Sequence, residues 1–152
     1  MKKIVVGLSL LLGSLFTINA QEISDNAVGL RIGSNDGFGA EISFQRKLKE
    51  KNRLEVNLGL RNGFSDLKLS GLYQWVWSLE EDLNWYAGAG GGFYDANKAS
   101  IFASGVVGIE YNLENDVNLP LLISLDYRPE IGITGDLNGL NSDLGLSLRY
   151  QF

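Results

Sequence analysis

Residues 144–152 read Leu-Gly-Leu-Ser-Leu-Arg-Tyr-Gln-Phe, with an apolar or aromatic side chain at every even position and a small or polar residue at every odd one. A period of two is that of a β-strand, in which successive side chains point to opposite faces of the sheet. The same pattern occupies seven earlier stretches, at 28–32, 38–44, 54–60, 67–77, 83–93, 101–111 and 119–127. The sequence therefore predicts an all-β protein of eight strands.

The two faces of these strands differ in polarity. The apolar rows hold no charged residue, whereas the positions between them carry Arg31, Glu41, Glu55, Lys68, Glu110, Asp126 and Arg149. In a water-soluble barrel or sandwich the apolar row faces inward, but in an outer-membrane barrel it faces lipid and the interior is polar. In the second case we expect these seven charged residues to form a structural network of paired charges in the lumen.

The positions of the aromatic residues favour the membrane alternative. If the first strand runs outward from the periplasm, the outer strand ends carry Phe38, Phe64, Phe93 and Tyr127, and the inner ends carry Trp75, Trp77, Trp85, Tyr111, Tyr150 and Phe152. Two such belts are typical of strands that cross a bilayer. An even number of strands also permits closure, so the prediction is an eight-stranded antiparallel up-and-down transmembrane β-barrel.

The residues between the strands predict short connections. Outer loops are expected at 34–37, where Asp36-Gly37 is a hairpin signal, and at 62–66, 95–99 and 130–141; inner turns are expected at 48–52, 78–82 and 112–118. Pro120 would then begin the seventh strand and Pro129 would follow its end. The basic segment 46–53 is interpreted as a solvated turn.

The first twenty residues are predicted to be a cleaved signal peptide. Lys2 and Lys3 precede an apolar run, and Ala20 supplies a small residue before the cleavage site. The barrel domain is therefore expected to span 21–152, and its acidic charge excludes a basic surface for nucleic acid.

The composition removes several kinds of chemistry. The chain of 152 residues contains no cysteine and no histidine, which excludes disulfides, Cys/His zinc sites and Ser-His-Asp catalysis. The glycine-rich run 88–92 lacks the lysine and the following helix of a phosphate-binding loop, so barrel packing is the better explanation. Glu41 and Glu55 could form an acid/base pair, but pairing with lumen cations is favoured. We expect a protein that is not an enzyme, with no catalytic residue, no cofactor and no metal.

The signal peptide, the eight amphipathic strands and the ending Arg149-Tyr150-Gln151-Phe152 resemble the small eight-stranded bacterial outer-membrane β-barrel proteins. The alternate C-terminal residues of this chain, Leu148, Tyr150 and Phe152, look like the C-terminal signal that the barrel assembly machinery reads in that family. The resemblance implies a bacterial outer-membrane location and contact with outer-membrane lipids, with lipopolysaccharide as one candidate. It carries over no catalytic residue.

Three functions remain open from the sequence. The first is a monomeric outer-membrane barrel whose lumen is filled by side chains, with a structural or surface-interaction role. The second is a narrow, low-conductance channel for ions or small solutes. The third is a soluble periplasmic barrel that binds an apolar ligand, in which Trp75, Trp77 and Trp85 would line the cavity.

Overall fold

The computed structural model of the chain describes residues 23–34, 39–61, 65–95, 98–135 and 140–152. The predicted signal peptide and the Asp36-Gly37 turn lie outside these residues. The strands are β1 (Asn26–Gly33), β2 (Gly39–Lys49), β3 (Asn52–Arg61), β4 (Asp66–Ser78), β5 (Leu83–Asp95), β6 (Ser100–Asn112), β7 (Leu121–Gly132) and β8 (Leu140–Gln151), with one short helix, α2 (Glu114–Val117). No helix in the described ranges is long and apolar enough to cross a membrane.

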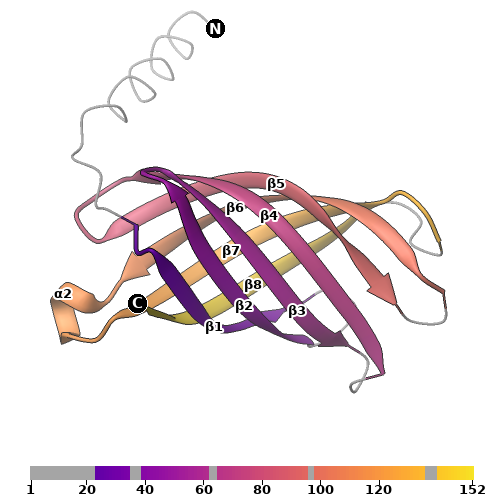
Figure 1. Ribbon diagram of the computed structural model, residues 1–152, viewed down its shortest axis with the longest axis horizontal. Coiled ribbons are helices and arrows are strands. Elements are labelled where there is room, and N and C mark those ends of the chain that lie inside the picture. Colours follow the sequence, from indigo (N-terminus) through magenta and orange to yellow (C-terminus); the bar gives the residue numbers. More distant parts are fainter. Residues whose placement is uncertain (1–22, 35–38, 62–64, 96–97, 136–139) are drawn as a thin grey trace, which may run out of the picture.

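The eight strands close into one barrel (Figure 1). Each strand pairs antiparallel with the next in sequence, and β1 closes the sheet by pairing with β8, so that Val28 lies opposite both Phe44 and Tyr150. This confirms the predicted fold, an eight-stranded antiparallel up-and-down barrel.

Alternation along the strands separates two chemically different surfaces. The apolar row points outward, and Leu30, Ile42 and Leu146 are 59%, 56% and 56% exposed. The row between points inward, and Arg31 and Arg149 are fully buried. This is the reverse of a protein that folds in water, where apolar side chains fill the interior.

The connections place both described chain ends at one end of the barrel. β2 and β3 are joined there by Glu50 and Lys51, and α2 lies there between β6 and β7 (Figure 1). At this end, Asn26 and Phe152 exchange two backbone hydrogen bonds, which tie the start of β1 to the end of the chain. The other end carries the last residues of β1, β3, β5 and β7 and the first residues of β2, β4, β6 and β8.

Strand β7 differs from the sequence prediction at both ends. It begins at Leu121, after Leu119 and Pro120, and it continues through Pro129 to Gly132. Pro129 lacks an N–H, and the β6–β7 ladder has no pair at this point, between Val107–Tyr127 and Ser104–Glu130. Because this pairing is interrupted, the strand accommodates the proline. The strand therefore continues past Tyr127, which lies inside it instead of at its outer end.

Candidate functional site

The interior of the barrel holds the seven charged residues singled out in the sequence. All are at least 94% buried, and each is hydrogen-bonded or ion-paired to other inward-pointing side chains: Arg31, Glu41, Glu55, Lys68, Glu110, Asp126 and Arg149. The strands hold them there because each lies on the inward row. Across the lumen, these residues and their partners form two linked clusters, which we call centres, one around Arg31 and one around Glu55. Two further ion pairs lie beside them.

The first centre is the Arg31 guanidinium on β1. It contacts Asp126 and Asp143 at 2.6 Å each and Glu41 at 3.4 Å. Gly145 faces this guanidinium, and a Cβ there would lie 2.2 Å from Arg31 Nη2. The glycine therefore provides the space that the planar guanidinium occupies between its carboxylates.

The second centre is the Glu55 carboxylate on β3. Arg128 of β7 donates to Glu55 Oε1 at 2.6 Å, and Arg149 of β8 donates to Oε2 at 3.3 Å. The amides of Gln45 and Gln74 also donate to Oε2, at 2.7 and 3.0 Å. Arg128 contacts Asp126 at 3.0 Å as well, so the two centres form one continuous network.

Two further pairs join other strands. Arg53 donates two hydrogen bonds to Glu110, at 2.6 and 3.0 Å, and its guanidinium lies 4.8 Å from the centre of the Tyr86 ring. Lys68 pairs with Glu130 at 2.5 Å and lies 5.1 Å from the centre of the Phe102 ring. Cations above aromatic faces are stabilised electrostatically in addition to their ion pairs.

Sequence reasoning missed two members of this network, Arg53 and Glu130, whereas it placed Arg128 and Asp143 near the outer rim of the lumen. It assigned Arg53 to a solvated turn and Glu130 to an outer loop, and these interpretations are wrong. The strands are longer than predicted, so both residues lie inside them, at 3% and 8% exposure. Extending the alternation of inward and outward side chains past the predicted strand ends places all four residues inside the barrel.

Part of the interior is apolar. Leu72, Val76, Tyr86 and Val106, from β4, β5 and β6, form a buried cluster with Ile23, which precedes β1. The glycine-rich run lies within β5, as predicted, and a Cβ at Gly92 would lie 2.5 Å from the Phe102 ring. Glycine there leaves room for the large aromatic ring from β6.

The outer surface carries the predicted aromatic and C-terminal residues that the structure describes, and Phe38 and Phe64 lie outside the described residues. Trp75 is 43% exposed, and Trp77 stacks on Trp85 with ring centres 4.4 Å apart. The C-terminal residues Leu148, Tyr150 and Phe152 are exposed by half or more on this same surface.

The ion pairs of the lumen connect different strands of the barrel. The ion pairs described above join two inward rows or two residues of one row, and no group of three or more potential metal ligands occurs in the described segments. Opposite charges that satisfy each other at 2.6 Å lower the cost of burying them. The site therefore cross-links strands that are distant in sequence, such as β3 with β7.

Comparison with known proteins defines the class of fold. The sequence matches no family model and no curated protein. Among solved structures, the N-terminal β-barrel domain of Pseudomonas aeruginosa OprF superposes with a TM-score of 0.65 at 11% identity, over 86% of this chain and 100% of that one. Neisserial surface protein A gives 0.58 at 16% identity, over 84% and 94%.

A de novo designed transmembrane β-barrel gives a TM-score of 0.65 at 19% identity and covers 88% of this chain and 100% of the design. The chain thus has the fold of the small eight-stranded outer-membrane β-barrels, as the resemblance in its sequence implied. The neighbours share this architecture at low sequence identity, so they define the fold and not a particular activity.

Proposed function

We propose that this protein is an integral protein of the bacterial outer membrane whose lumen is closed by its own side chains, with a structural or surface-interaction role and no catalytic activity. The observation that carries the proposal is the inverted distribution of polarity. Large apolar side chains lie on the outside of the barrel, whereas the charged side chains of the lumen network are buried inside it. Only a hydrocarbon surrounding makes that distribution favourable.

The same distribution argues against a soluble barrel that binds an apolar ligand. That function requires Trp75, Trp77 and Trp85 to line an interior cavity. Trp75 instead lies on the outer surface, and the Trp77–Trp85 stack comes from outward positions of β4 and β5. Aromatic residues at one rim are suited to a membrane–water interface.

Closure of the lumen is supported by contacts that cross it. The Arg128–Glu55 pair joins β7 to β3, and the Arg31–Asp126 pair joins β1 to β7, both at 2.6 Å. Eight strands leave an interior that side chains can fill. We therefore expect this barrel not to conduct ions, and the exposed Tyr150 and Phe152 to serve its assembly into the membrane.

Two measurements test the proposal. Fractionation of native cells should place the mature protein in the outer membrane, and its unboiled form should migrate differently from the boiled form on electrophoresis. Planar bilayers containing the refolded protein should show no unitary currents. Soluble periplasmic protein would contradict the membrane location, and reproducible currents that change in Lys68→Gln would establish the channel instead.

A further inference from the structure

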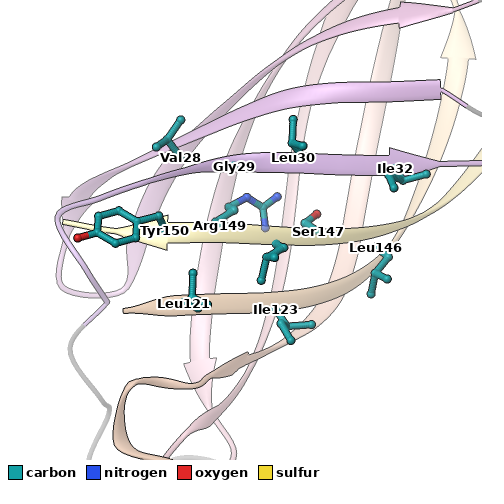
Figure 2. Close-up of a pocket in the computed structure, with 11 residues that line it drawn as sticks. Val28, Gly29, Leu30, Ile32, Leu121, Ile123, Leu146, Ser147, Arg149 and Tyr150 are labelled. Atoms are coloured by element: carbon teal, nitrogen blue, oxygen red, sulfur yellow. The ribbon is translucent and has the colours of Figure 1, made fainter. Parts of the chain in front are cut away.

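The outer surface has a groove where the barrel closes. Outward side chains of three adjacent strands, β1, β8 and β7, surround a hollow of about 560 Å³ (Figure 2). Its walls include Val28, Leu30, Leu121, Ile123, Leu148 and Tyr150. We call it the seam groove, because it lies over the β1–β8 pairing.

The seam groove is apolar because its polar neighbours point the other way. Arg149 also borders it, but the Arg149 guanidinium turns inward and donates to Ser43, Ser124 and Glu55. Gly29 borders it too, and a Cβ there would lie 2.0 Å from the Leu148 carbonyl oxygen. Gly29 lies on the inward row of β1, so the absent side chain lets β1 and β8 approach each other and adds nothing to the outer wall of the groove.

An exposed cation lies near one end of the groove. Arg46 points outward from β2 and is exposed, opposite Asn26 in the β1–β2 ladder, one outward position beyond the Phe44–Val28 pair. Val28 and its partner Tyr150 border the groove at this end. Arg46 and Lys49 are the positively charged residues on the outward rows of the described strands, and Lys49 lies farther along β2, where it pairs with Asn52 of β3.

We propose that the seam groove and Arg46 together bind one anionic phospholipid of the inner leaflet, with an acyl chain along the groove and the phosphate of the negatively charged headgroup on the Arg46 guanidinium. The proposal rests on the membrane location proposed above, because only that location brings lipid to this surface. Charge complementarity identifies the occupant, since a guanidinium matches a phosphate geometrically and electrostatically. Arg46 lies opposite Asn26, which is hydrogen-bonded to Phe152, so it is at the end of the barrel that carries both described chain ends, which is expected to face the periplasm.

Lipid retention by the refolded protein tests this site. The full mature chain is placed in nanodiscs of equal parts phosphatidylglycerol and phosphatidylcholine, released, and examined by native mass spectrometry. We expect one retained lipid, with phosphatidylglycerol favoured about fivefold, the factor that corresponds to about 1 kcal/mol for one cation at an anionic surface. Arg46→Gln should abolish this preference.

Two matched controls separate the site from general effects. Lys51→Gln removes an exposed cation from the adjacent turn and should leave the preference unchanged. Leu148→Trp fills the groove and should lower retention of both lipids, whereas Leu58→Trp, on the outward row of β3, should not. Equal retention of the two lipids by the wild type, equal effects of the two cation variants, or normal retention in Leu148→Trp would overturn the proposal. Failure of the wild type to enter nanodiscs would instead overturn the membrane location itself, and the lipid site with it.

Discussion

Replacing Glu55 by glutamine should show how much the lumen network contributes to stability. The Glu55 carboxylate is fully buried and accepts hydrogen bonds from both Arg128 and Arg149. Glu55→Gln keeps the shape but removes the negative charge, so two buried guanidinium groups lose a shared partner. Breaking a buried ion pair in this way costs about 3 to 5 kcal/mol, and we expect a loss of that size.

The assay is urea unfolding in lipid vesicles, followed by tryptophan fluorescence and by the mobility of unboiled protein on gels. A matched control is Glu50→Gln in the exposed β2–β3 turn, which should change stability by no more than about 0.5 kcal/mol. The partner variant Arg128→Met completes a double-mutant cycle with Glu55→Gln. Because the two groups touch at 2.6 Å, their coupling energy should exceed about 0.5 kcal/mol.

The reasoning would be refuted by a particular combination of results. If Glu55→Gln unfolded at the wild-type urea concentration and the cycle gave additive effects, the network would be a consequence of folding and not a source of stability. A loss seen equally in Glu50→Gln would point to the overall charge of the protein instead.

Three other variants test the facing of the strands and the packing of the lumen. Ile123→Arg puts a charge on the outward row of β7 and should cost about 2 to 4 kcal/mol if that row meets the bilayer midplane; unchanged unfolding in vesicles would show that it does not. Gly145→Ala places a methyl group within 2.2 Å of Arg31 Nη2 and should cost about 1 to 3 kcal/mol through overpacking, read from the same unfolding curves. Gly71→Ala, where nothing lies within 4 Å of the new Cβ, is the matched control and should unfold like the wild type.

The strand ends show why the extent of the network was underestimated from the sequence. Arg128 and Glu130 flank Pro129, and a proline after an alternating run is ordinarily a sign that the strand has ended. The structure carries β7 past this proline because the β6–β7 ladder is interrupted beside it. Arg53 was misassigned for a related reason, since it follows several charged residues that do lie in or beside an exposed turn.

Period-two alternation by itself determined the class of fold and the number of strands, because it depends only on which face each side chain occupies. The same parity identified Arg31, Glu55 and Arg149 as inward residues. Only closure of the barrel decided which acidic residue pairs with which basic residue. Closure brings β1 beside β8 and sets β7 across from β3, so Glu55 and Arg128, 73 residues apart, come within 2.6 Å. The seam groove likewise exists only because the two ends of the chain pair, a contact between strands that no local pattern encodes.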